Sequence, residues 1–174
     1  NVLMSREDLE KAFGAGNIID DDEPFGLVVL SDVALGEYRD DSVILLAKII
    51  GDADFGPDAR RVEFFEIPLA SNDKNEIDLA GDLVNQMGKL SNAMLYVDAG
   101  GVGNTVCKLI ERSGGVVERV NWGAPCFRKE YKERFYNQRA CAMVRFRDAV
   151  RDGRVSITAD ISKQLRKKII DQGS

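Results

Sequence analysis

The chain of 174 residues has the length of one domain, and with 44% hydrophobic and 30% charged residues it can bury a core. It contains no histidine, which excludes a Ser-His-Asp triad, and its three cysteines are too few and too widely spaced for a disulfide framework. No apolar run approaches the roughly 20 residues that cross a bilayer, and no secretory signal is visible. We therefore expect a protein of a reducing compartment that is neither secreted nor inserted in a membrane.

The net charge of −5 conceals two parts of opposite sign. Residues 1–100 carry 8 basic and 21 acidic residues, a net charge of −13, whereas residues 101–174 carry 16 basic and 8 acidic ones, a net charge of +8. Both parts can be ordinary solvated surface. The alternative is that the acidic part holds metal ions while the basic part faces a polyanion such as DNA.

Hydrophobic periodicity predicts one order of elements along the chain. Residues 1–24 are predicted to be a lead-in, with a short helix capped by Ser5 and an acidic linker, and residues 25–174 to be the domain. Three strands, joined by turn-like segments at 36–40 and 56–58, predict an antiparallel meander at 25–34, 42–50 and 61–69. The elements predicted after them are helix 75–90, strand 93–97, helix 105–113, strand 115–120, a mostly helical stretch 129–151, strand 154–158, and a last helix capped by Asp160.

Strand–helix–strand units need right-handed crossovers and parallel pairing. The order therefore predicts an α/β fold with a mixed sheet, in which three antiparallel strands are followed by parallel ones and helices cover both faces. This is the order of the ribonuclease H-like fold, although a fold alone does not fix a function.

Two aspartates are candidates for metal binding. Asp32 shares its strand face with Val28 and Leu30, and a carboxylate beside an apolar face is costly unless it is paired or bound to a cation. Asp98 ends the strand 93–97 and precedes a glycine-rich turn, at the carboxyl end of the sheet where α/β proteins bind ligands. The structural alternatives are a strand-end aspartate bonded to turn amides and a tight turn that lets the next helix approach the sheet.

Paired carboxylates at neighbouring strand ends suit Mg²⁺ or Mn²⁺. Two such ions about 4 Å apart can clamp the attacking and leaving oxygens of a phosphodiester, and this chemistry needs no histidine. Asp41 lies across the first predicted hairpin, and we expect it to support the site without binding the metal directly.

The candidate contacts to DNA lie in the basic part. Arg139 falls within an apolar stripe of the predicted helix 135–151, where a guanidinium needs an anionic partner, unless it reaches the solvent by snorkelling. Arg128, Lys129 and Lys132 alternate with aromatic residues, which suggests backbone contact with stacking, although a solvated helix face explains them equally. Other arginines of this helix, Arg145 among them, are predicted to be plain surface.

The sequence resembles the nuclease domain of the large terminase subunit of tailed bacteriophages. Residues 26–36 with 40–43 resemble its first nuclease motif, and Tyr96-Val97-Asp98-Ala99-Gly100-Gly101-Val102-Gly103 resembles its second. Residues 120–123 and 136–140 resemble the later Asn-Lys-Arg-Ala region, with Gln138 in place of the usual Lys. Residues 153–157 resemble the strand that follows that region. The resemblance covers about residues 25–170 and depends on the order of the pieces.

The resemblance implies an endonuclease that cuts concatemeric viral DNA during genome packaging, with Asp32 and Asp98 binding a pair of Mg²⁺ or Mn²⁺ ions and Asp41 and Arg139 in support. It implies double-stranded DNA, an N-terminal ATPase motor domain, the small terminase subunit and the portal as partners, in the host cytoplasm and transiently at the procapsid. Two departures matter. No Walker motif of the ATPase motor is present in these residues, and the Ser-Pro-Asp-x-x-Asp segment that usually holds the family's third catalytic acid is absent. We therefore expect an incomplete metal site, or one that residues outside this sequence complete.

Two other functions compete with this one. The first is a DNA-gripping or protein-docking module with little nuclease activity, which would use the same basic surface. The second is a junction resolvase of the same fold, which is less favoured because such enzymes usually act as free dimers.

Overall fold

The computed structural model describes residues 3–34, 40–51 and 60–174. The predicted turn at 56–58 and nearly all of the predicted hairpin loop 36–40 lie outside these residues. The described helices are α1 (Arg6–Gly14), α2 (Glu76–Gly88), α3 (Gly103–Arg112), α4 (Lys129–Arg134), α5 (Gln138–Arg151) and α6 (Lys163–Gly173). The described strands are β1 (Gly26–Asp32), β2 (Ser42–Ile50), β3 (Arg61–Ser71), β4 (Ala93–Asp98), β5 (Glu118–Val120) and β6 (Val155–Ile157).

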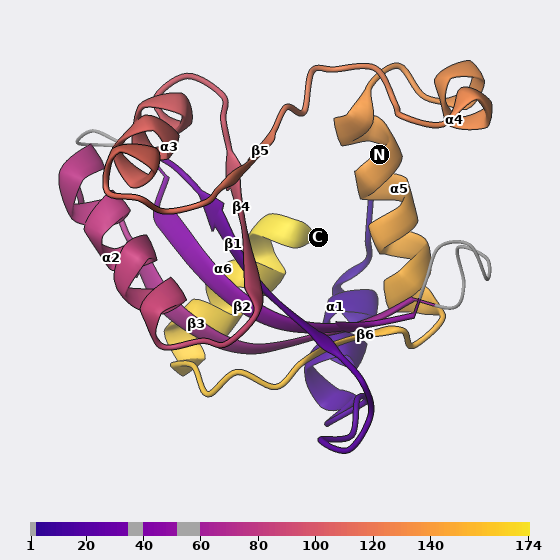
Figure 1. The fold of residues 1–174 in the computed structure, drawn as a ribbon. Helices are drawn as coiled ribbons and strands as arrows, with labels where there is room; N and C mark the ends of the chain where they lie inside the picture. Colours follow the sequence, from indigo (N-terminus) through magenta and orange to yellow (C-terminus); the bar gives the residue numbers. More distant parts are fainter. Residues whose placement is uncertain (1–2, 35–39, 52–59) are drawn as a thin grey trace. The chain divides into compact units, whose positions relative to one another are not determined.

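The strands form one mixed sheet in the order β5-β4-β1-β2-β3-β6 (Figure 1). The first three strands along the chain are antiparallel neighbours, whereas β4 pairs in parallel with β1, β5 with β4, and β6 with β3. This arrangement confirms the predicted ribonuclease H-like order of strands. It places the carboxyl ends of β1, β4 and β5 next to one another.

The described chain divides into two compact units. We call Gly26–Ala47 with Ile67–Trp122 the α2–α3 unit, and Asn1–Phe25 with Lys48–Glu66 and Gly123–Ser174 the terminal unit. Strands β2 and β3 contribute residues to both. Each unit is described by itself.

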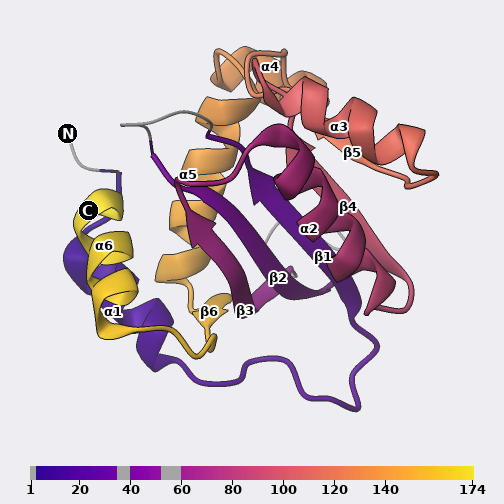
Figure 2. The same ribbon diagram turned by 90° about the vertical axis from the view of Figure 1, so that its left-hand side faces the viewer.

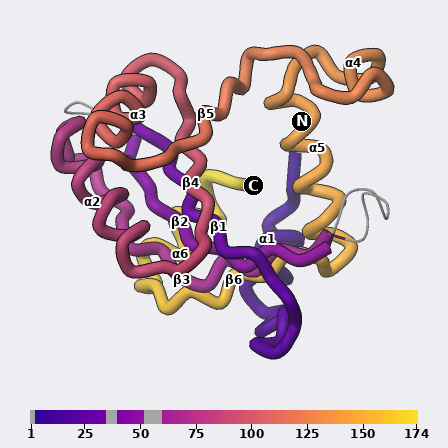
Figure 3. The backbone as a smooth tube through the Cα atoms, in the orientation of Figure 1, coloured from indigo at the N-terminus to yellow at the C-terminus, as the bar shows by residue number. Residues whose placement is uncertain are grey.

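The α2–α3 unit packs two neighbouring helices with three parallel strands. Helix α2 begins after Asn75, whose side chain accepts a hydrogen bond of 2.8 Å from the Asp78 amide. Helices α2 and α3 lie side by side (Figure 2). The most completely buried residues of this unit come from both helices and from the central strands: Val29, Ile44, Leu46, Ala47, Leu79, Leu83, Val97, Val106, Cys107 and Ile110. Figure 3 follows the backbone from β4 through α3 to β5.

The terminal unit has a core of its own, built from both ends of the chain. Its buried residues are Met4, Leu9, Ala12, Val150, Val155 and Ile170, with Phe64 and Phe146 packed against them. Ser5 and Asp8 form the predicted capping box of α1. Met4 and helix α1 thus pack with the C-terminal part of the chain, because they supply apolar side chains that this core buries.

Two predicted helices differ from the observed ones. The stretch 129–151 is broken because Phe135 is extended and the Asn137 side chain caps a new helix by accepting from the Ala140 amide at 2.9 Å. The last helix is capped by Ser162, whose hydroxyl accepts from the Leu165 amide, so the prediction that Asp160 caps it is wrong. The three cysteines are free and buried, as predicted. Within the part of the chain that the structure describes, no helix is long and apolar enough to cross a membrane.

Candidate metal site and nucleic-acid contacts

The register of β1 and β4 brings two candidate ligands to neighbouring positions. Ser31 pairs with Val97 in the parallel ladder. The next residue along each strand is the last one of that strand, Asp32 in β1 and Asp98 in β4. Parallel neighbours are about 4.8 Å apart, and residues in register point to the same face. Both carboxylates therefore leave the sheet on one side, at its carboxyl end.

The Asp98 carboxylate is held by the turn that follows it. Its Oδ1 accepts a hydrogen bond of 2.9 Å from the Gly100 amide, which is the geometry of an Asx turn. Gly101 has a φ of +53°, a conformation that favours glycine. The Ala99 amide donates to the Val120 carbonyl of β5 at 3.0 Å. One carboxylate oxygen is thus used to fix the side chain, while the other can face a ligand.

Gly103 lets helix α3 begin directly against the end of β4. A Cβ at this position would overlap the carbonyl oxygen of Asp98 and would lie 3.8 Å from the Cβ of Val33. The predicted close approach of helix and sheet after a glycine turn is therefore confirmed.

Two buried serines fasten the chain on either side of Asp32. The Ser42 hydroxyl donates to the Ala34 carbonyl at 2.7 Å and accepts from the Ala34 amide at 3.1 Å. The Ser31 hydroxyl donates to the Val43 carbonyl at 3.0 Å. Asp41, which precedes Ser42, is half-buried and lies across this hairpin from the segment after Asp32. Sequence reasoning did not single out these serines, because a buried hydroxyl between two strands gives no signal in the sequence.

The surroundings of Asp32 differ from the prediction. Its side chain is exposed, and its neighbour on the same strand face, Leu30, is only half-buried. The expected cost of burying this carboxylate is therefore absent, because β1 reaches the solvent at its last residue. Asp32 can meet a ligand without being stripped of water beforehand.

The two aspartates fit an ion that takes most of its ligands from water and from substrate phosphates. Among residues 3–34, 40–51 and 60–174, no group of three or more acidic or cysteine side chains could hold a metal ion. Asp41 therefore does not complete a three-acid cluster with Asp32 and Asp98. Mg²⁺ usually binds through one or two carboxylates together with water and substrate phosphates, and this donor set matches the pair.

The basic candidates lie in the terminal unit. Arg139 is the second residue of α5 and is exposed, which agrees with the alternative that it reaches the solvent by snorkelling. The helix starts three residues later than predicted. Arg128, Lys129 and Lys132 are exposed at the cap and on the surface of the short helix α4. Their exposure fits a solvated helix face and a phosphate contact equally.

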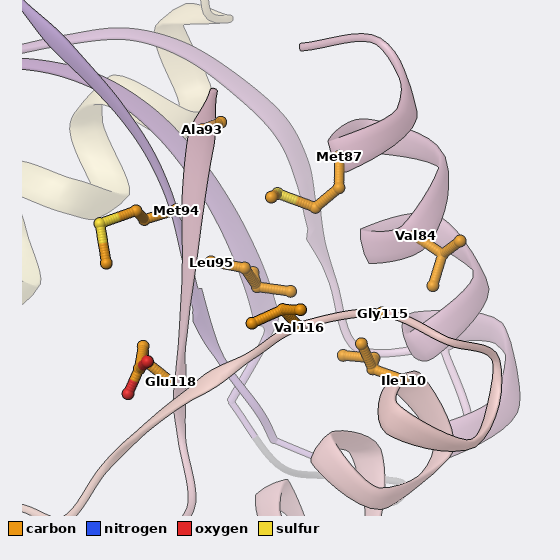
Figure 4. Close-up of a pocket in the computed structure, with 9 residues that line it drawn as sticks. All are labelled: Val84, Met87, Ala93, Met94, Leu95, Ile110, Gly115, Val116 and Glu118. Atoms are coloured by element: carbon orange, nitrogen blue, oxygen red, sulfur yellow. The ribbon is translucent and has the colours of Figure 1, made fainter. Parts of the chain in front are cut away.

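An apolar cavity of about 190 Å³ lies elsewhere in the α2–α3 unit. Met87 of α2, Ile110 of α3, Leu95 of β4 and Val116 line it (Figure 4). It lies at the start of β4, whereas Asp98 ends that strand, and Glu118 is the charged residue among those lining it. The cavity therefore lacks the groups needed for phosphodiester chemistry.

Comparisons with known proteins agree with the resemblance. The chain is 28% identical over 158 residues to a protein described as a probable terminase, large subunit, of Enterobacteria phage P7, a match that covers 89% of the chain and 31% of that protein. The chain thus spans about a third of the length of this curated relative. No family model matches the sequence.

Solved structures share the fold. The nuclease domain of the large terminase subunit gp2 of bacterial virus Sf6 matches with a TM-score of 0.67 and 15% identity, covering 99% of the chain and 80% of that structure. The large terminase nuclease of thermophilic phage G20c, solved with bound magnesium, matches with a TM-score of 0.57 and 17% identity over 99% of the chain and 79% of that structure. The fold is that of the large terminase nucleases. A further structure of the Sf6 domain contains manganese and matches with a TM-score of 0.62 and 16% identity.

Proposed function

We propose that this chain is a divalent-metal-dependent endodeoxyribonuclease domain that cuts concatemeric viral DNA during genome packaging. The observation that carries the proposal is the register of β1 and β4, which sets Asp32 and Asp98 side by side at the carboxyl end of the sheet. The sequence relative, a probable terminase large subunit, and the large terminase nucleases that share the fold support it.

Asp32 and Asp98 would hold Mg²⁺ or Mn²⁺, and two ions fit the proposed chemistry. When bound, such ions offset the charge of the scissile phosphate and make water a better nucleophile. The Gly100 amide keeps the Asp98 carboxylate in a fixed orientation, and the two buried serines hold the chain on both sides of Asp32 in place. Asp41 and Arg139 are proposed supporting residues, Asp41 through its place across the hairpin and Arg139 through its exposed charge.

We propose the remaining partners from the same relatives. They are double-stranded DNA, an ATPase domain of the full-length protein, the small terminase subunit and the portal. The site of action is the host cytoplasm and, transiently, the procapsid.

Plasmid cleavage tests the proposed nuclease. Purified protein with Mn²⁺ should nick and linearise supercoiled plasmid with little sequence preference, and EDTA should stop the reaction. Asp32→Asn and Asp98→Asn should each abolish cleavage with their thermal unfolding unchanged or raised, because each removes a like charge from the pair. Asp160→Asn, which changes an exposed aspartate of the terminal unit, is the matched control and should cut as the wild type does. Equal cleavage by all four proteins would indicate a contaminating nuclease.

A second candidate is a DNA-gripping module with little cleavage of its own. The observation in its favour is that, among the described residues, no group of three or more acidic side chains could hold a metal ion. Binding of plasmid in Mn²⁺ without any cleavage, by a protein whose Asp32→Asn variant binds equally well, would support this candidate instead.

A further inference from the structure

The terminal unit contains a groove lined by four arginines. Its volume is about 360 Å³, within the range of pockets that hold small ligands. The four cations come from separate parts of the chain: Arg60 precedes β3, Arg134 ends α4, Arg145 lies on α5 and Arg154 precedes β6. Because these residues are scattered in the sequence, no motif indicated that they would meet. Arg145 is exposed, as predicted, and it lines the groove.

The groove carries an excess of positive charge. Asp148 is the acidic residue among those lining it, and its Oδ1 accepts a hydrogen bond of 2.9 Å from Arg147, which is not among them. Arg154 donates to the Arg60 carbonyl at 3.2 Å and to Asp152 at 3.0 Å, so its guanidinium is fixed in place. Guanidinium groups gathered in this way repel one another, and an anion bound among them relieves that repulsion.

Aromatic rings lie among the arginines. The guanidinium of Arg145 lies 5.2 Å from the centre of the Tyr131 ring, and that of Arg134 lies 5.5 Å from the centre of the Phe135 ring. Phe146 also lines the groove. Each guanidinium lies over its ring, and such a stack of flat groups can be continued by a nucleic-acid base while the guanidinium N–H groups contact phosphates.

We propose that this groove, which we call the arginine groove, binds single-stranded DNA. The three exposed arginines, Arg60, Arg134 and Arg145, would contact phosphates, and a base would stack on Tyr131 or Phe135. Arg154, paired with Asp152, would add to the positive field from below the surface. A duplex hides the faces of its bases in the stack, so the rings favour unpaired nucleotides, whereas arginines alone would accept either form. The choice of DNA as the polymer rests on the proposed function; the binding chemistry rests on the groove itself.

Fluorescence anisotropy tests the proposal in the presence of EDTA, so that metal-dependent cleavage at Asp32 and Asp98 plays no part. The probes are a labelled oligothymidylate of about 16 nucleotides and a labelled duplex of the same length. We expect the wild type to bind the single strand more tightly than the duplex. Arg134→Ala/Arg145→Ala should weaken single-strand binding about tenfold or more, and its slope against log salt should flatten by about 0.7 for each phosphate that the variant no longer neutralises.

Two further comparisons separate stacking from charge. Tyr131→Leu should weaken single-strand binding at least about fivefold and leave duplex binding unchanged, whereas Tyr131→Phe, which keeps the ring, should bind as the wild type does. Lys108→Ala/Arg112→Ala removes the same charge from exposed positions on α3 and should change single-strand binding less than about twofold, because it leaves the groove intact.

Three results would overturn the proposal: equal weakening in the α3 control, equal weakening on single strand and duplex, or unchanged binding by Tyr131→Leu. If the double arginine variant fails to fold in thermal unfolding, the pair Tyr131→Leu and Tyr131→Phe decides the matter alone. Absence of plasmid cleavage with intact single-strand binding would reject the proposed nuclease and leave the arginine groove standing.

Discussion

Gly103 lies so close to Asp98 that a Cβ on Gly103 would overlap the Asp98 carbonyl oxygen. Helix α3 therefore begins against the strand end that carries a proposed metal ligand. The start of α3 can contact the end of β4, which carries Asp98, only because residue 103 is a glycine and has no side chain.

Gly103→Ala should lower the free energy of unfolding by about 1–3 kcal/mol, because the new methyl group meets backbone that cannot move aside. It should also reduce plasmid cleavage, since displacing the carbonyl moves Asp98. Urea unfolding measures the first effect. The matched control is Gly81→Ala in α2, where a Cβ would meet nothing within 4 Å. This substitution should raise the free energy of unfolding by about 0.5–1 kcal/mol. Equal effects of the two changes would contradict the close approach.

Binding of metal should be visible as stabilisation. At a Mn²⁺ concentration about tenfold above its Kd, the wild type should gain about 1.4 kcal/mol of stability, because the ion binds the folded state alone. For a domain of this size, that gain corresponds to a rise of roughly 3–6 °C in Tm. Thermal unfolding with and without Mn²⁺ measures it. Asp32→Asn should lose the gain and Asp160→Asn should keep it; the same rise in both variants would place the ion elsewhere.

The sequence was sufficient for the elements that repeat a simple pattern. Strands β1 and β2 were predictable because each is a short run of apolar, β-branched residues, and helix α2 because its apolar residues follow a period near 3.6. The break between α4 and α5 could not be predicted, because the apolar pattern continues without interruption across it. The break depends on the extended backbone of Phe135 and on the cap that the Asn137 side chain provides. The same break places Arg139 in the first turn of α5, where its side chain is exposed.

The candidate site shows the same division. Asp32 could be singled out as a carboxylate within an apolar strand and Asp98 as a carboxylate at the end of one, and the order of the strands implied that they are neighbours. The hydroxyls of Ser31 and Ser42 could not, since their role depends on which strands pair and in which register. The arginine groove combines residues from four separate places in the chain, so it became visible only in the folded structure.

Acid should weaken the terminal unit through Glu23. Hydrogen bonds from Arg61, at 2.7 Å, and from the Asp20 amide, at 2.8 Å, lower the pKa of Glu23 below its usual value. A lowered pKa in the folded state means that the stabilisation is complete above the unfolded pKa, about 4.3, and is lost as pH falls through the folded pKa. Glu23→Gln should therefore flatten the dependence of unfolding free energy on pH below about pH 5.

Urea unfolding from pH 7 down to about pH 3 measures this dependence. Glu7→Gln is the control, since Glu7 is an exposed acid of α1, and it should leave the slope as in the wild type. A slope in Glu23→Gln equal to that of the wild type would show that other carboxylates, such as Asp171 beside Lys167 and Arg6, govern the acid response.

Contact of α4 with duplex DNA is tested by charge reversal. Lys129 and Lys132 are exposed on a helix of six residues, and Glu130 and Glu133 lie between and beside them. If both lysines meet phosphates, Lys129→Glu/Lys132→Glu should weaken binding at low salt and flatten the slope of log K against log salt by about 1.8, because two fewer counterions are released. Anisotropy with a labelled duplex across a salt series measures both quantities, again in EDTA.

Reversing the charge of the neighbouring acids, Glu130→Lys/Glu133→Lys, should strengthen binding and steepen the slope. Unchanged affinity and slope in both variants would mean that α4 presents an ordinary solvated face and that duplex DNA follows another path on the protein.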